Sequence, residues 1–329
     1  MQVMPTDEVR VGGHRWTEVA SGLQFPEGPV AMPDGSVLLV EIQRGTVDRV
    51  APDGSVRVVA ETGGGPNGLA IGPDGAAYVC NNGGCFSWRE VQGLTIPGPR
   101  PDTWRGGSIQ WVDLGTGSVT TLYTEADGVA LRAPNDLVFD TSGGMWFTDH
   151  GTRTKRTSDR TGVFYAAADG SSIREVLHPL DAPNGIALSP GEDRLYVAET
   201  PTGRVWSWEL TGPGQCRRGN PLGPAGGTLL AGLPGMQRLD SMAVDSGGNV
   251  CVATLVNGGI TVIAPGGASV DHVSTDDLIT TNICFGGPDL RTAFVTLSGT
   301  GRLVSTTWPR PGLPLAYGTR PVGLDRAPR

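Results

Sequence analysis

The 329-residue sequence lacks the features that mark several common classes of protein. No apolar run reaches the roughly 18 residues that a membrane span needs, and the start, MQVMPTDEVRVGGHRW, has no signal-peptide core. The 5 cysteines are an odd number without CxxC spacing, which argues against a disulfide framework or a thiolate zinc site. No run of Lys or Arg accompanies the net charge of −8. We therefore expect a cytoplasmic protein that binds neither nucleic acid nor a membrane.

The usual signs of a covalent nucleophile are missing as well. A GxSxG motif does not occur, and the four histidines are scattered at His14, His150, His178 and His272. Among the cysteines, Cys85 alone falls in a long loop that we expect near a ligand-binding site. The sequence therefore gives little support to serine or thiolate catalysis.

Glycine and proline, in contrast, are abundant, with 51 and 26 residues, and they punctuate an internal repeat. Each copy consists of a loop, a short apolar strand, a polar turn and a second apolar strand. The turns PDG, PDG, SGG, GED and SGG supply Gly or Asp for the positive φ of a tight hairpin. The copies are FPEGPVAMPDGSVLLVE, GPNGLAIGPDGAAYVCN, APNDLVFDTSGGMWFTD, APNGIALSPGEDRLYVAE, RLDSMAVDSGGNVCVAT and, more weakly, TNICFGGPDLRTAFVTL.

Two further strand-like runs follow most of these hairpins, so each unit is predicted to hold four antiparallel strands. Six such units in 329 residues average about 55 residues each, close to known blade lengths. We predict an all-β fold, a six-bladed β-propeller forming one domain over residues 1–329. The last unit is a strand short, and we expect HRWTEVASG near the N-terminus to complete it and close the ring. A solenoid is the competing architecture, but no distinct capping repeats are visible.

The loops before the first strand of each unit all open on one face of such a meander. They carry oxygen-bearing side chains in the same register, at Glu27, Asn67, Asn135, Asn184, Asp240 and Asn282. A single Asn before Gly usually caps a turn, but a turn cap has no reason to become Glu in one unit and Asp in another. Carboxylate and amide oxygens suit Ca²⁺ first, then Mg²⁺ or Mn²⁺. We therefore predict one divalent metal on the axis.

Two long loops fall on the same face, and loops of this length usually cover or bind a ligand. The first, residues 81–107, carries Trp88 and Trp104, which we expect to form an apolar wall. The second, residues 149–161, carries a basic cluster and His150. A solvated surface loop explains the basic cluster equally well.

In this order, FPEGPV, the PNG, PND and PNG loops, MWFTD and RLDSMAVD resemble the gluconolactonase, regucalcin and senescence-marker-protein family over roughly residues 20–300. The resemblance implies a six-bladed propeller with one catalytic divalent cation, commonly calcium, acting on lactones. It further implies metal ligation by Glu27, Asn135, Asn184 and Asp240, with Asn135 either ligating or holding substrate. Arg132 lies near the place of a substrate-binding basic residue in relatives. Ser241 stands where the family usually has Gly.

These observations lead to a functional prediction, a hydrolase that opens a lactone or related ester with metal-activated water. Asp240 is the first candidate for general base, followed by Asp136 and Asp149, and Asn135 is the second residue expected to take part in catalysis. Asn67, Arg132, Trp88, Trp104 and His150 are expected to contact substrate, while Zn²⁺ remains an alternative metal. A non-catalytic scaffold and a metal-independent condensing enzyme are the alternatives. We expect a monomer or a loose homo-oligomer.

Overall fold

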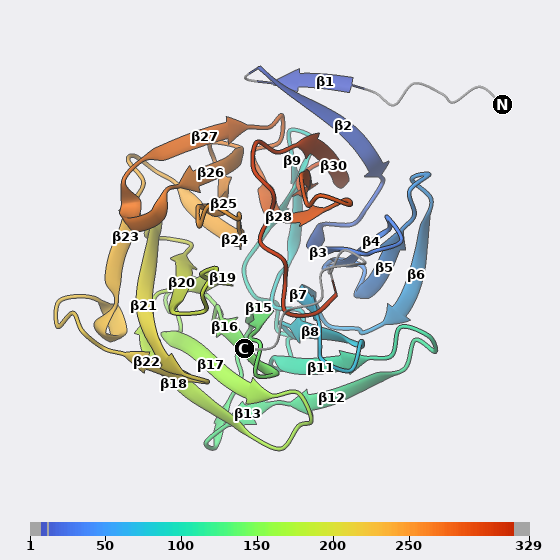
Figure 1. Ribbon diagram of the computed structural model, residues 1–329. Coiled ribbons are helices and arrows are strands. Elements are labelled where there is room, and N and C mark those ends of the chain that lie inside the picture. Colours follow the sequence, from blue (N-terminus) through green and yellow to red (C-terminus); the bar gives the residue numbers. More distant parts are fainter. Residues whose placement is uncertain (1–7, 12, 319–329) are drawn as a thin grey trace.

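The computed structural model describes residues 8–11 and 13–318, and it arranges six antiparallel sheets in a ring around a central axis (Figure 1). Each sheet is one blade, numbered here in chain order. The first strand of each blade lines the axis and contacts the first strands of its two neighbours. The predicted six-bladed propeller of four-stranded blades is therefore confirmed.

The strands of the blades have the following bounds. The inner strands are β3 (Pro26–Ala31), β7 (Pro66–Ile71), β15 (Pro134–Phe139), β19 (Pro183–Leu188), β24 (Arg238–Val244) and β28 (Thr280–Gly286). The second strands are β4 (Val37–Glu41), β8 (Ala77–Asn81), β16 (Gly144–Asp149), β20 (Arg194–Glu199), β25 (Val250–Leu255) and β29 (Thr292–Leu297). The third strands are β5 (Thr46–Val50), β11 (Ser108–Val112), β17 (Thr161–Ala167), β21 (Arg204–Gly212), β26 (Gly259–Ile263) and β30 (Arg302–Thr307). The outer strands are β6 (Val56–Glu61), β12 (Val119–Tyr123), β18 (Ile173–Leu180), β23 (Thr228–Gly232), β27 (Val270–Ser274) and β2 (His14–Ser21).

The ring is closed by a strand from the other end of the chain, as predicted. β2 pairs antiparallel with β30, with Thr17 opposite Ser305, and β1 (Glu8–Val11) adds a fifth strand outside it. Trp16 of β2 is buried and its indole Nε1 donates to the carbonyl of Ser274 in the fifth blade at 3.0 Å. The sixth blade therefore contains strands from both ends of the described chain.

Positive φ angles at the inner hairpin turns explain most of the repeated turn residues. Gly35 and Gly75, the glycines of the two PDG turns, have φ of 82° and 81°, which only glycine adopts without strain. The fourth blade departs from the expected pattern. In its GED turn the positive φ, 53°, falls on Glu192 rather than on Gly or Asp.

Six clusters of buried apolar side chains hold the ring together, one between each pair of neighbouring blades. Between the third and fourth blades, for example, Trp146 packs with Trp208, and both side chains are almost completely buried. Both faces of every blade are covered, which is why the central strands are apolar almost throughout. The inner strands are thereby held rigidly around the axis.

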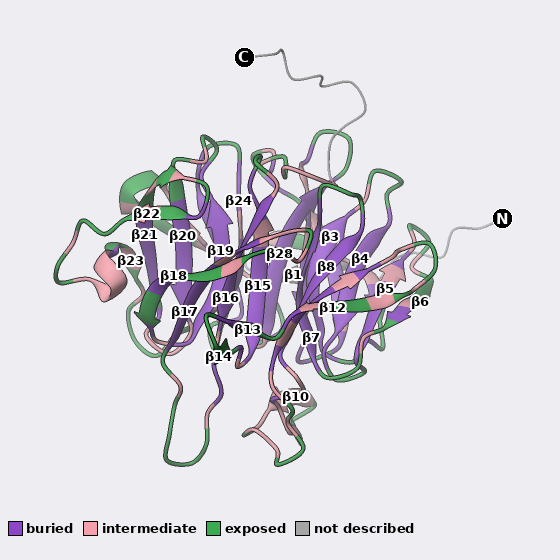
Figure 2. Cartoon of the chain, turned by 90° about the horizontal axis from the view of Figure 1, so that it is seen from below, coloured by how far each residue is buried: buried purple, intermediate pink, exposed green. Residues whose placement is uncertain are grey.

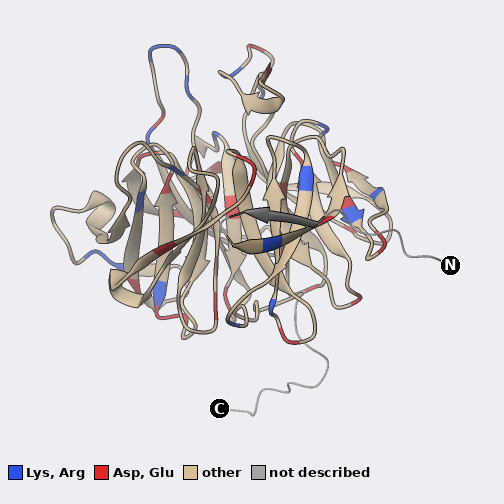
Figure 3. Cartoon of the chain, turned by 90° about the horizontal axis from the view of Figure 1, so that it is seen from above, with Lys and Arg blue, Asp and Glu red and all other residues tan. Residues whose placement is uncertain are grey.

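The two faces of the ring differ. The hairpin of β9 (Trp88–Val91) and β10 (Leu94–Pro97) and the 150–160 loop project from one face, called here the mouth face (Figures 2 and 3). The short hairpin of β13 (Glu125–Ala126) and β14 (Val129–Ala130) lies before the third inner strand. On the opposite face, called the back face, the last described residues cross the axis (Figure 1). No helix in the described part of the chain is long and apolar enough to span a membrane.

Candidate metal centre at the mouth of the propeller

An interruption in strand pairing recurs near the start of every inner strand. In each blade the register between the first and second strands shifts around the residue that the sequence repeat singles out, for example between Glu27 and Val30 or between Leu239 and Met242. A β-bulge of this kind turns a side chain away from the face it would otherwise occupy. We use the term axial ring for the residues so placed, Glu27, Asn67, Asn135, Asn184, Asp240 and Asn282.

The glycines that follow three of these residues permit close approach between inner strands. A Cβ at each would lie 2.6 Å from a carbonyl oxygen of the next blade. The pairs are Gly28 with Asn67, Gly68 with Asn135, and Gly185 with Asp240. Only Gly28 has a positive φ, so close backbone approach rather than turn capping explains the repeated glycine. In the fifth blade Ser241 takes this place and is fully buried.

Three oxygens of the axial ring are buried without a hydrogen-bond partner. They are Oε1 of Glu27, Oδ1 of Asn135 and Oδ1 of Asn184. The other polar atoms of Glu27 and Asn184 are engaged, since Glu27 Oε2 accepts from Asn282 Nδ2 at 2.7 Å and Asn184 Nδ2 donates to Thr200 Oγ1 at 3.1 Å. Buried polar atoms are nearly always paired, and three unpaired acceptors that gather on one axis have the chemistry of cation ligands. The residues present therefore fit a divalent cation.

The charges around the ring favour the same conclusion. Burial, and then the nearby carboxylate of Asp240, raise the pKa of Glu27 well above its usual value. Burial raises the pKa of Asp240 to about 7, opposed by the amide of Asn184 and supported by the charge of Asp136. Burial likewise raises the pKa of Asp136 to about 7. Three buried carboxyl groups without a counter-charge are costly in their ionised form, and a bound cation would remove that cost.

Within residues 8–11 and 13–318, no group of three or more His, Cys, Asp or Glu side chains is placed to hold a metal. The axial ring instead combines two carboxylates with four amides. Amide carbonyls are ordinary ligands of Ca²⁺, so the ring differs from sites built on carboxylates, imidazoles or thiolates alone.

Arg132 and Trp104, both predicted to contact substrate, are held in a stack beside the mouth. The Arg132 guanidinium lies 4.5 Å from the Trp104 ring centroid, and that of Arg100 lies 4.6 Å from it. Arg132 Nε also donates to Asp159 Oδ2 at 3.0 Å, which ties the 150–160 loop to the third blade. The Trp104 indole donates to the carbonyl of Asn82 at 2.9 Å. Both side chains therefore support the long loops.

Trp88 belongs to an aromatic cluster at the edge of the ring. Its ring centroid lies 4.9 Å from that of Phe25, two residues before Glu27, and 6.0 Å from that of Phe86. The β9–β10 hairpin then reaches across the mouth face to the sixth blade, where the amide of Thr95 donates to the carbonyl of Gly299 at 2.8 Å. This hairpin is named the lid below.

His150 and Asn67 differ in their surroundings. His150 Nδ1 lies 3.1 Å from the carbonyl oxygen of Gly151, and burial lowers the pKa of its imidazole to about 4, so the ring is neutral at pH 7. Asn67 is buried in the axial ring, and its side chain has no hydrogen-bond partner within the described part of the chain. Asn67 is thus open to a ligand on the axis.

The residue at the end of the second strand positions the loop before the inner strand. Asp149 accepts hydrogen bonds from the amides of Arg132, Ala133 and Gly151 at 2.6 to 2.9 Å, which accounts for its carboxylate without a role as base. Equivalent side chains in three other blades bind an amide of the corresponding loop, namely Glu41, Asn81 and Glu199. The recurrence of LLVE, YVCN, WFTD and YVAE in the sequence was the signal for this role.

These features define a class of protein, a six-bladed propeller with a ring of carboxylate and amide side chains at the axial mouth. The chain matches the family described as SMP-30/Gluconolactonase/LRE-like region over residues 25–299, and it belongs to that family. Its fold agrees with that of solved family structures, so the predicted resemblance is confirmed.

Individual relatives are moderately similar in sequence. A gluconolactonase of Zymomonas mobilis is 28% identical over 304 residues, covering 82% of this chain and 75% of the relative. The lactonase drp35 of Staphylococcus saprophyticus is 28% identical over 275 residues, covering 83% and 75%.

Two solved structures illustrate the shared fold. A gluconolactonase of Xanthomonas campestris superposes with a TM-score of 0.70 at 23% identity, covering 91% of each chain. A calcium-binding protein, regucalcin, of Agrobacterium tumefaciens superposes with a TM-score of 0.68 at 17% identity, covering 90% and 94%.

Proposed function

We propose that this protein hydrolyses lactones or related esters at a divalent cation held by Glu27, Asn135, Asn184 and Asp240. The observation that carries the proposal is the set of three unpaired, buried oxygens on the axis, one of which belongs to Glu27, with the carboxylate of Asp240 nearby. The relatives named gluconolactonase and lactonase support the reaction class. Ca²⁺ is the first candidate because all donors are hard oxygens, with Mg²⁺, Mn²⁺ or Zn²⁺ as alternatives.

When bound, such a cation would act as a Lewis acid toward a carbonyl oxygen and lower the pKa of a coordinated water. The protein itself would hold the metal-binding oxygens in place. Asn282 holds Glu27 through Oε2 and leaves Oε1 facing the axis, while Thr200 does the same for Asn184. Because the donor side chains are already oriented, binding requires little reorganisation.

Asp240 is our candidate for general base. In its ionised form it accepts a proton from water as the water oxygen bonds to the lactone carbonyl carbon. The ring carbon–oxygen bond then breaks, and the proton passes from Asp240 to the departing alkoxide, which yields a hydroxy acid. A bound cation would favour the ionised form of Asp240, in which the carboxylate can act as the base, whereas the raised pKa applies to the ring without a cation. Asn135 would hold substrate or complete the cation site.

The walls of the mouth supply the substrate contacts in this proposal. Trp88 with Phe25 forms an apolar wall beside Glu27, and Arg132 contributes positive charge on the side of the third blade. His150, being neutral, would act as a polar wall rather than as a charged anchor. Trp104 would act through Arg132, whose guanidinium it stacks against.

The test is metal content measured together with acid release from aldonolactones, aliphatic γ- and δ-lactones and aryl esters. We expect one divalent ion per chain and loss of hydrolysis on chelation. Asp240→Asn should lower kcat/KM by roughly 10³-fold or more, and Glu27→Gln should weaken metal binding by roughly 100-fold. The matched control is Asp271→Asn, an exposed carboxylate on β27.

Two results would contradict the proposal. A metal-free protein that is inert on every lactone and ester would remove the catalytic function. Full activity in the presence of chelator, or in Asp240→Asn, would leave a hydrolase but would refute the roles given to the cation and to Asp240.

A further inference from the structure

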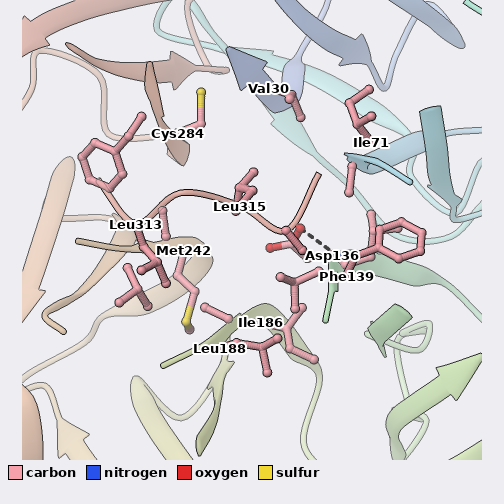
Figure 4. Close-up of a pocket in the computed structure, with 18 of the residues that line it drawn as sticks. Val30, Ile71, Asp136, Phe139, Ile186, Leu188, Met242, Cys284, Leu313 and Leu315 are labelled. Atoms are coloured by element: carbon pink, nitrogen blue, oxygen red, sulfur yellow. Dashed lines mark hydrogen bonds between the residues drawn. The ribbon is translucent and has the colours of Figure 1, made fainter. Parts of the chain in front are cut away.

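A cavity of about 330 Å³ lies on the axis on the back-face side of the axial ring (Figure 4). All six inner strands line it, mostly with residues that follow the ring, such as Gly28 and Asp136, and Asn282 is the one member of the axial ring that also lines it. Glu27, Asn135, Asn184 and Asp240 are not among its lining residues. The cavity is therefore a compartment separate from the mouth, and the proposed hydrolysis does not use it.

A segment near the C-terminus, residues 311–317, covers this cavity and is named the strap. Backbone hydrogen bonds anchor it to the fifth and sixth blades, from Gly312 to Leu290 at 2.7 Å and from Leu313 to Val244 at 2.9 Å. At its other end, the ring of Tyr317 packs edge-on against Phe139 of the third blade, with centroids 5.9 Å apart. The strap thus spans the back face and contributes lining residues of its own.

The interior of the cavity is mainly apolar. Figure 4 shows Ile71, Phe139, Ile186 and Leu188 around one side, with the carboxyl group of Asp136 near the centre. Water occupies a cavity only where it finds two to four polar partners, whereas a dry apolar cavity of about 150 Å³ already accepts benzene. The space at the axis is about twice that volume, which suits a bicyclic or similarly sized molecule.

Asp136 is the polar group that the cavity offers to a ligand. Three other polar side chains along its wall are already engaged, since Asn282 donates to Glu27, Ser189 to Asp193, and Glu192 accepts from Thr141. The hydroxyl of Tyr317 lies close to Gly143, in the turn between β15 and β16. Asp136 Oδ1 accepts from the amide of Leu137 at 2.9 Å. The amides of Ile186 and Met242 and the Ser241 hydroxyl also approach this carboxyl group and, against the larger effect of burial, lower its pKa, but among the described residues the Leu137 bond alone has normal hydrogen-bond geometry, which leaves capacity for a ligand hydroxyl. A ligand that matches this wall is apolar and carries one hydroxyl.

We propose that the axial cavity is a second ligand site, which binds a small, mainly apolar hydroxy compound with its hydroxyl on Asp136. The ligand enters from the back face under the strap. Binding is independent of the metal, because none of the four side chains assigned to the cation lines the cavity.

The experiment uses 2-naphthol as the probe and naphthalene as its partner without a hydroxyl, titrated into the full chain in EDTA and followed by calorimetry. We expect one 2-naphthol site and roughly fivefold weaker binding of naphthalene, the effect of one hydrogen bond. Leu188→Trp should fill the cavity and weaken 2-naphthol binding at least tenfold. Ala70→Leu, a smaller change on the same wall, should weaken it severalfold, and thermal melting establishes that both variants fold.

The mouth offers a competing aromatic site, so its contribution is tested directly. Trp88→Ala removes the lid aromatic and should leave 2-naphthol binding unchanged, whereas Asp136→Leu should abolish the preference for 2-naphthol over naphthalene. Absence of any 2-naphthol site overturns the proposal. So does binding that Trp88→Ala abolishes and folded Leu188→Trp retains. Because all titrations contain chelator, these outcomes are independent of whether the protein hydrolyses lactones.

Discussion

The two halves of the inner strands differ in chemistry although they belong to the same six strands. Toward the mouth face, the first residues of each strand present carboxylate and amide oxygens to the axis, and three of these oxygens are fully buried without a hydrogen-bond partner in the described part of the chain. Toward the back face, the following residues are apolar and enclose the cavity under the strap. The bulges separate the halves, because each one turns a polar side chain to the axis before regular pairing resumes. One repeated strand thus builds two compartments with different ligand chemistry.

The largest expected effect comes from disturbing the close approach between neighbouring inner strands at the axial ring. Gly185→Ala places a Cβ 2.6 Å from the carbonyl oxygen of Asp240 and should lower the free energy of unfolding by roughly 2–4 kcal/mol, since backbone must move. Denaturant titration measures this. Gly219→Ala is the control, because no atom lies within 4 Å of its added Cβ. Equal stability of the two variants would contradict the close packing of the ring.

A second variant tests a residue that orients a proposed metal ligand, rather than the ligand itself. Asn282→Ala removes the hydrogen bond to Glu27 Oε2 and should weaken divalent-metal binding by roughly 10- to 100-fold, as loss of an orienting partner usually does. Calorimetric titration with Ca²⁺ measures the change. Unaltered affinity would mean that Glu27 is oriented by other contacts.

The pH dependence of stability tests the boundary between the halves, where Asp136 lies. Its pKa is raised to about 7 in the folded protein, so the folded state keeps a proton that the unfolded chain loses near pH 4. The stability that this proton supplies is lost as pH rises through about 7. In chelator, Asp136→Asn should therefore gain roughly 2–3 kcal/mol relative to wild type between pH 5 and pH 8.

Comparing variant with wild type removes the opposite contribution of His150, whose pKa is lowered to about 4 and which is present in both proteins. Chemical denaturation at the two pH values gives the difference. A gain that does not depend on pH would show that Asp136 is ionised throughout.

The smallest expected effect concerns the loops of the mouth. Arg132→Met breaks the contact with Asp159 and the stack on Trp104, and it should raise KM for the best lactone roughly 3- to 10-fold with kcat changed less than about twofold. Steady-state kinetics provide the measurement. Arg105→Met, an exposed neighbour of Trp104, is the control, and an equal effect of both variants would point to net charge alone.

Much of the fold followed from local patterns in the sequence. The recurring hairpins, with glycine turns at Gly35 and Gly75, predicted four-stranded units, and the short last unit predicted the closing role of β2. The common register of Glu27, Asn135, Asn184 and Asp240 predicted an axial ring. These features are readable because strand period and turn chemistry act over a few residues.

Other features depend on residues that are distant in sequence. The glycine after the ring residues is required by the next blade's backbone, and Asp149 holds amides of a loop before β15. Arg132, which is still predicted to contact substrate, is also paired with Asp159 and stacked on Trp104. Such pairings arise from packing between elements, which no local periodicity encodes.

The number of blades, the closure of the ring and the register of its polar residues could be predicted from local patterns, because each depends on residues repeated along one strand or turn. The folded chain was needed to see which oxygens lack a partner, where the lid crosses the mouth and that a strap encloses an apolar cavity. These depend on how six blades meet at one axis, and the distances there are set by packing between strands that lie up to 255 residues apart, as Glu27 and Asn282 do.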